Sequence, residues 1–231
     1  MYWKGCARFS SPPIRSVIVK SIQIKALTAA VLLSAAAAAQ ADITTYTSQA
    51  AFNAAVGNRG VDTFNDLSID LLPESLSRTA GSYSYTASAP GSQLYGAGGA
   101  GDGWLSTNRA TDTILFNGFM PGVTAAGGFF FGSDIAGQWV EGSTVIVHAS
   151  DGVDSADFTI SNSGVNSFVG FSSTRGLVSL SMESVSATGP VWNTANNFTL
   201  GQVQAVPEPA EYAMLLAGLL SLGWTARRRR G

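Results

Sequence analysis

Cysteine, lysine and histidine are scarce in this sequence of 231 residues, and each scarcity excludes a class of protein. The single cysteine, Cys6, lies near the N-terminus, so the rest of the chain can form neither a disulfide nor a cysteine metal centre. No lysine follows Lys25, and residues 42–205 hold thirteen acidic residues against four arginines, a formal net charge of −9. Because phosphate binding requires lysine and arginine, we expect no nucleic-acid partner.

The sequence also contains few residues in patterns typical of catalytic sites. The sole histidine, His148, falls in a β-prone run in which it shares a face with Ile146. No Gly-x-Ser-x-Gly elbow is present to supply an activated serine. The glutamates of residues 42–205 show no spacing that singles out the carboxylate pair a glycosidase needs. We therefore expect no enzyme, with a secreted hydrolase as an alternative.

No cofactor is expected either, although the acidic residues leave calcium as an alternative in two places. Neither place has the spacing of an EF-hand loop. The first is the acidic segment Asp151, Asp154 and Asp157, and the second combines Asp62, Asn65 and Asp66 with Asn196 and Asn197. Solvated turns and strand edges are the simpler interpretation of both.

Residues 1–41 have the pattern of a secretory signal peptide. Five basic residues up to Lys25 precede an apolar run at 26–39, which is too short for an ordinary membrane-spanning helix. Ala39 and Ala41 form a small-x-small site, so we expect cleavage before Asp42. Export across the inner membrane follows from this interpretation.

Residues 42–205 are long enough for one domain, and their composition favours an all-β fold. We expect a two-layer antiparallel β-sandwich of jelly-roll type with one short helix, residues 49–56, capped by Ser48. The expected strands are 60–64, 83–87, 113–117, 123–131, 143–149, 156–160, 167–171, 177–182 and 197–203. The runs 167–171 and 177–182 are expected to pair with each other, and the glycine-dense stretch 91–103 to be a flexible surface loop.

Residues 206–231 combine three unlike elements in order. Val206, Pro207, Glu208 and Pro209 should be extended, because proline fixes φ and lacks a backbone donor. An uncharged apolar run of fifteen residues, 212–226, follows and is expected to be a transmembrane helix, although it is somewhat shorter than the roughly 20 residues that usually span a membrane. Arg227, Arg228, Arg229 and Arg230 would then remain in the cytoplasm.

This tail resembles the PEP-CTERM sorting signal of Gram-negative bacteria, and the resemblance covers only residues 206–231. It implies recognition by the membrane enzyme exosortase through Val206–Pro209, transient anchoring in the inner membrane, and transfer of the body to the cell surface or outside. The arginines 227–230 would act as the cytoplasmic stop. A plain C-terminal anchor that nothing processes is the alternative.

Residues 123–202 also resemble, loosely, the jelly-roll bodies common among PEP-CTERM proteins. The resemblance implies a non-enzymatic surface or extracellular-matrix protein of the exopolysaccharide layer or biofilm. A carbohydrate-binding module is the first alternative, since aromatic side chains stack on sugar rings. Trp104 and Trp192 are the possible sugar-binding residues, with Tyr95 as a further aromatic candidate, whereas Trp139 is expected in the core.

Overall fold

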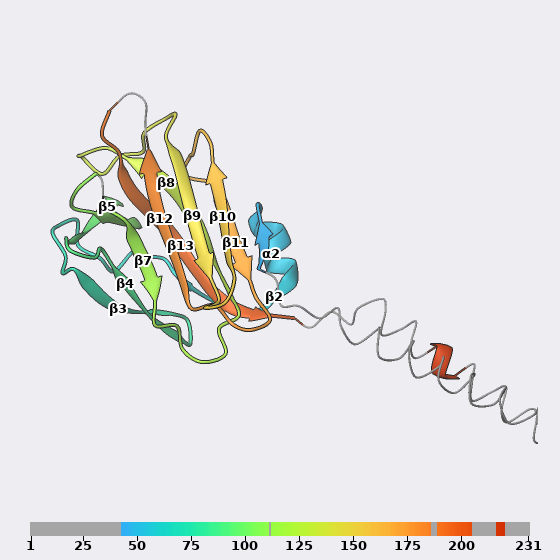
Figure 1. Ribbon diagram of the computed structural model, residues 1–231. Coiled ribbons are helices and arrows are strands. Elements are labelled where there is room, and N and C mark those ends of the chain that lie inside the picture. Colours follow the sequence, from blue (N-terminus) through green and yellow to red (C-terminus); the bar gives the residue numbers. More distant parts are fainter. Residues whose placement is uncertain (1–42, 111, 186–188, 205–215, 220–231) are drawn as a thin grey trace, which may run out of the picture. The chain divides into compact units, whose positions relative to one another are not determined.

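A computed structural model describes residues 43–110, 112–185, 189–204 and 216–219 (Figure 1). The body contains thirteen strands in two antiparallel sheets and one short helix. This confirms the predicted two-sheet, mostly antiparallel β architecture. Residues 216–219 are helical, and in the part of the chain that is described no helix is long and apolar enough to cross a membrane.

Sheet A has seven strands and contains the last strand of the body near its centre. Its spatial order is β1 (Thr44–Tyr46), β11 (Phe168–Ser172), β8 (Ala125–Ser133), β13 (Trp192–Val203), β6 (Asp102–Thr107) and β5 (Leu94–Gly99), with β2 (Val56–Asp62) also paired to β13. Strand β13 pairs with β8 on one side, and with β6 and then β2 on the other. The change of partner falls at a bulge, where Asn197 adopts a left-handed φ of 49°.

Sheet B has six strands. Its spatial order is β10 (Ser155–Ile160), β9 (Thr144–Ser150), β12 (Ser179–Val185), β7 (Ile114–Asn117), β4 (Tyr83–Ser88) and β3 (Ser75–Ala80). Alternation sets the two faces of each strand, because successive side chains of a strand point to opposite sides. In β9, Val145 and Val147 are buried while Ile146 and His148 are partly exposed, as predicted.

The core fills the space between the two sheets with side chains from both. Phe198 of sheet A stacks on Phe116 of sheet B with ring centroids 4.2 Å apart. Tyr85 of β4 contacts the same Phe198 at 5.0 Å, and Phe130 of β8 lies 6.5 Å from Phe116. Burial of such large aromatic rings supplies the main driving force for pressing the sheets together.

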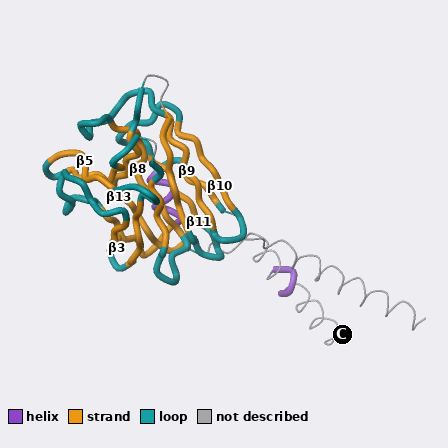
Figure 2. The backbone as a smooth tube through the Cα atoms, turned by 60° about the vertical axis from the view of Figure 1, so that its left-hand side comes forward, coloured by secondary structure: helices purple, strands orange, loops and turns teal. Residues whose placement is uncertain are grey.

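Helix α2 (Gln49–Ala55) covers the outer face of sheet A near β11, and Figure 2 shows β11, β8 and β13 side by side in that sheet. Ser48 caps the helix by accepting the N–H of Ala51, which confirms the predicted N-terminus. Phe52 is fully buried and meets Phe168 of β11 at 5.4 Å. The helix ends at Ala55, one residue before the expected end at residue 56, because β2 begins directly at Val56.

Two sequence-based expectations about the strands and their pairing are wrong. Residues 91–103 are not a loop: most of them form the β5–β6 hairpin. Glycine is needed there because a Cβ on Gly96 would lie 1.9 Å from the carbonyl oxygen of Ser68. Strands β11 and β12 do not pair either, since β11 joins sheet A and β12 joins sheet B.

A buried ion pair connects the two sheets at the end of β2. Asp62 is 4% exposed and accepts from Arg78 Nε at 2.9 Å and Nη2 at 2.7 Å. It also accepts the Tyr85 hydroxyl at 2.7 Å and the N–H of Phe64 at 3.0 Å. The other side of the Arg78 guanidinium binds Asp66, again through two hydrogen bonds. Asp62 belongs to sheet A, whereas Arg78 and Tyr85 belong to sheet B.

The charges in this cluster stabilise one another. The hydrogen bond from Arg78 lowers the pKa of Asp66, and the Asp66 partner raises the pKa of Arg78. Burial, followed by the neighbouring Asp62 charge, raises the pKa of Tyr85, so its hydroxyl stays protonated and donates. At neutral pH these shifts keep Asp66 and Arg78 charged and Tyr85 neutral.

Replacing Arg78 with methionine should destabilise the body by about 3–5 kcal/mol, because Asp62 would remain buried without its cation. The matched control is Arg175→Met, since the Arg175 side chain is 39% exposed and its ion pair with Asp154 is half in solvent. That change should cost less than about 1 kcal/mol. Urea unfolding at pH 7 measures both, and equal losses for the two variants would show that Asp62 does not need Arg78.

Candidate functional site

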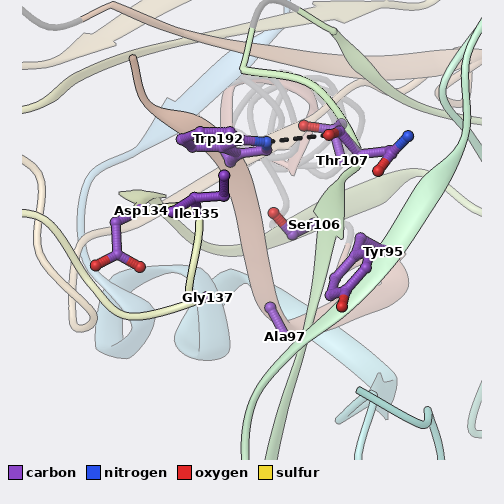
Figure 3. Close-up of a pocket in the computed structure, with 9 residues that line it drawn as sticks. Tyr95, Ala97, Ser106, Thr107, Asp134, Ile135, Gly137 and Trp192 are labelled. Carbon is purple, nitrogen blue, oxygen red and sulfur yellow. Dashed lines mark hydrogen bonds between the residues drawn. The ribbon is translucent and has the colours of Figure 1, made fainter. Parts of the chain in front are cut away.

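A pocket of about 230 Å³ opens on the outer face of sheet A, on the side away from the core. The side chains of β5, β6 and β13 that point outward form its floor and two of its sides. The turn that follows β8 forms another side. The lining residues are Tyr95, Ala97, Ser106, Thr107, Asn108, Asp134, Ile135, Gly137 and Trp192 (Figure 3).

Trp192 stands at one side of this pocket with its indole ring held in place. The ring nitrogen Nε1 donates to the carbonyl oxygen of Asn108 at 3.2 Å. The side chain is partly exposed, and Figure 3 shows Ser106 lying between it and Tyr95. Two aromatic side chains from different strands thus flank one hollow.

The turn after β8 adds one carboxylate and one apolar side chain. Asp134 Oδ1 accepts the N–H groups of Ala136 and Gln138, both at 2.9 Å, which fixes the carboxylate at the pocket. Ile135 is 84% exposed and lines the pocket beside Trp192 (Figure 3). Gly137 has a φ of 73°, which a residue with a side chain adopts only with strain.

A chain of buried hydroxyl groups supports the floor. Thr194 Oγ1 lies 3.2 Å from Ser106 Oγ and 2.7 Å from Ser133 Oγ, so hydroxyls from β6, β13 and β8 form one hydrogen-bonded row. Ser106 Oγ also donates to the carbonyl oxygen of Asn193. Because every hydroxyl in the row has a partner, the floor is rigid and polar.

The arrangement can hold a small ring that has one apolar face and a polar rim. The faces of Trp192 and Tyr95 offer apolar stacking surface, and Asp134, Asn108 and Thr107 offer hydrogen-bonding groups. An apolar surface with a few fixed polar groups is the usual make-up of a small-molecule site. Its volume is below the about 300–1,000 Å³ that encloses a drug-sized ligand, so it fits about one ring.

The candidate tryptophans fall in three different environments. Trp192 lines the pocket, as described above. Trp104 is 8% exposed and packs edge-on against Phe131 at 4.9 Å, so its ring is part of a small cluster with Ala97. The prediction of a core position for Trp139 is wrong: the residue is 43% exposed, with Nε1 bonded to the carbonyl oxygen of Ser163.

His148 lies away from this pocket, on the outer face of sheet B. Its Nδ1 is 2.7 Å from Asp157 Oδ1, and its Nε2 is 3.8 Å from Glu183 Oε1. No serine among the described residues forms a hydrogen bond with it, although nucleophilic catalysis needs that contact. His148, Asp157 and Glu183 form a group of polar side chains on the surface of sheet B.

The two expected calcium alternatives are not assembled. Asp62 and Asp66 share Arg78, Asn65 accepts the N–H of Gly103, and Asn196 donates to Asp102. In the other segment, the Asp151 carboxylate accepts hydrogen bonds from the N–H groups of Asp154 and Val153 and from the Ser173 hydroxyl. These hydrogen bonds lower the pKa of Asp151, and the bond from the Asp154 N–H has the largest effect. In the described part of the chain, no group of three or more acidic, histidine or cysteine side chains could hold a metal.

The terminal candidates lie outside the described residues. These are the cleavage residues Ala39 and Ala41, the motif Val206, Pro207, Glu208 and Pro209, and the arginines Arg227, Arg228, Arg229 and Arg230. Among the residues that sequence reasoning missed are Asn108, Asp134 and Ile135 of the pocket. All three lie in turns that only the fold brings beside Trp192, and no sequence signal marks them.

Comparison with known proteins gives one distant structural likeness. No family model matches the sequence, and no curated protein matches it. The solved structure of TmCBM61 in complex with beta-1,4-galactotriose is similar at 13% identity and a TM-score of 0.34, over 51% of this chain and 88% of that one. At this level the likeness carries no functional conclusion for this chain.

Removing the two tryptophans should affect stability differently. Trp104→Ala should cost about 3–5 kcal/mol, because it empties a buried site against Phe131. Trp192→Ala should cost about 1 kcal/mol or less, since the ring is partly exposed and makes one hydrogen bond. Urea unfolding followed by circular dichroism checks this, and a larger loss for Trp192 would place that ring in the core.

Proposed function

We propose that the body of this protein is a non-catalytic, sugar-binding β-sandwich of jelly-roll type. The observation that carries the proposal is the fixed, partly exposed ring of Trp192 beside a polar pocket flanked by Tyr95. Sugar rings pair an apolar C–H face with a rim of hydroxyls, which matches this combination of aromatic surface and hydrogen-bonding groups. A polysaccharide chain would place one ring in the pocket.

The carboxylates support binding over hydrolysis. Asp134 is the one carboxylate among the residues that line the pocket. Glycoside hydrolysis generally uses two carboxyl groups about 5–9.5 Å apart on either side of the scissile bond. With a single carboxylate, held by two backbone N–H groups, the site is suited to hydrogen-bonding a hydroxyl.

We infer a second function from the C-terminal tail, namely sorting of the protein to the cell surface. The specific observation is the Val206–Pro209 motif, with the apolar run and the arginines behind it. Strand β13 ends at Val203, so three residues of sequence separate the sandwich from Pro207. The protein would be exported, anchored briefly in the inner membrane, processed by exosortase and left in the exopolysaccharide layer.

Changing Trp192 to Ala should weaken retention by polysaccharide at least about tenfold, the effect expected for a central aromatic anchor. Affinity electrophoresis in gels containing different neutral and acidic polysaccharides measures the retention. The matched control is Trp139→Ala, which removes an exposed tryptophan that does not line the pocket and should leave retention unchanged. A wild-type protein that no polysaccharide retains would contradict sugar binding.

Changing Glu208 to Ala should leave export intact but block removal of the tail, so full-length protein accumulates in the membrane. In the sequence the Pro-Glu-Pro segment comes shortly before the apolar run, and its prolines should keep the glutamate accessible to a membrane enzyme. Glu211→Ala is the matched control, because it removes an acid of the same tail outside the motif. Intact mass and membrane partition are measured with and without exosortase, and an intact tail on surface-released wild-type protein would favour the plain anchor.

A further inference from the structure

Three buried oxygen atoms without a hydrogen-bond partner belong to residues near one end of the two sheets. Among the described residues, five buried side-chain polar atoms have no hydrogen-bond partner. Three of them, Asp112 Oδ2, Ser184 Oγ and Asn193 Oδ1, are oxygens of residues that the fold brings together. Such atoms are rare in folded proteins, and a group of them calls for an occupant such as a water or an ion.

The strand register explains why the three residues meet. In sheet B, β12 pairs with β7 so that Met182 faces Ile114, the last pair of that register, and Ser184 and Asp112 each lie two residues beyond it. Ser184 shares the inward face of β12 with Leu180 and Met182. Across the core in sheet A, Asn193 donates through Nδ2 to the carbonyl oxygen of Asp112. The three oxygens therefore come from both sheets.

Charge decides between a cation and a water. Asn193 is 1% exposed, and Asp112 Oδ2 is buried beside it without an arginine or histidine partner in the described residues. The nearest arginine in sequence, Arg109, contacts Asp112 only through the main chain, where its carbonyl oxygen accepts the Asp112 N–H. The Asp112 side chain is partly exposed, but its Oδ2 faces the interior, where a water would satisfy hydrogen bonds and leave the negative charge without a cation.

We propose that Asp112, Ser184 and Asn193 form a calcium-binding site between the two sheets. Calcium takes carboxylate, amide and hydroxyl oxygens in flexible geometry, whereas a transition metal would prefer nitrogen or sulfur ligands. The site has a single carboxylate, and calcium affinity is lower when fewer of the ligands are charged. Its dissociation constant should therefore be about 10⁻⁴–10⁻³ M, the range of extracellular calcium modules.

The proposed site adjoins the pocket without depending on sugar binding. Asn193 follows Trp192 in β13, and Asp112 belongs to the same connection as Asn108, whose carbonyl oxygen holds the Trp192 ring. The ion would thus attach the connection between β6 and β7 to β13. Calcium binding is measured directly, so its presence or absence is separate from any result with polysaccharide.

The test uses full-length protein in detergent, freed of calcium with a chelator and kept at constant ionic strength. Isothermal titration should show about one calcium per chain, and 10 mM calcium should raise Tm by about 3–10 °C at that affinity. Asp112→Asn should abolish both effects. Asp134→Asn, which removes the pocket carboxylate, should leave both unchanged.

Asp112→Asn could lose calcium binding because it misfolds, so a second variant that should gain affinity is also tested. Asn193→Asp adds a second carboxylate to the same site and should tighten calcium binding at least about tenfold, because ligand charge sets affinity. Three results would overturn the proposal: no calcium-dependent Tm shift in the wild type, binding that survives Asp112→Asn, or an Asn193→Asp variant whose calcium affinity does not rise.

Discussion

The carboxylate of Asp62 is the constraint on which the joining of the two sheets depends. It ends β2 in sheet A, yet its hydrogen bonds from Arg78 and Tyr85 come from sheet B. A carboxylate this deeply buried is tolerable only when its cation and hydroxyl donors are all in place. The hydrogen bonds of Asp62 therefore fix the position of one sheet relative to the other, while the stacked rings of Phe116 and Phe198 contribute the apolar packing between them.

Much of the architecture could be predicted because alternation is a local property of the sequence. Strands β4, β7, β9 and β10 alternate cleanly, and Ser48 marks the start of α2. The β5–β6 hairpin could not be predicted, because its glycines reflect close contacts with residues 64–68, which are distant in sequence from Gly96 and Gly103. A glycine-dense stretch looks the same whether it is a free loop or a strand pressed against another backbone.

The candidate site was predictable only in part, for a related reason. Trp104 and Trp192 both point to the outer face of sheet A, and neither composition nor spacing distinguishes them. The two residues differ in solvent exposure. Phe131 and Ala97 pack around Trp104, whereas part of the Trp192 side chain is exposed at the pocket. The exposure of Trp139 likewise depends on the conformation of the turn after β8, which the neighbouring sequence does not predict.

The central position of strand β13 in sheet A determines how the domain would respond to a pulling force. This strand is hydrogen-bonded along both sides and leads directly toward the C-terminal tail. A tension applied through that tail would pull β13 lengthwise between its neighbours, loading many hydrogen bonds at once in shear instead of opening them one by one.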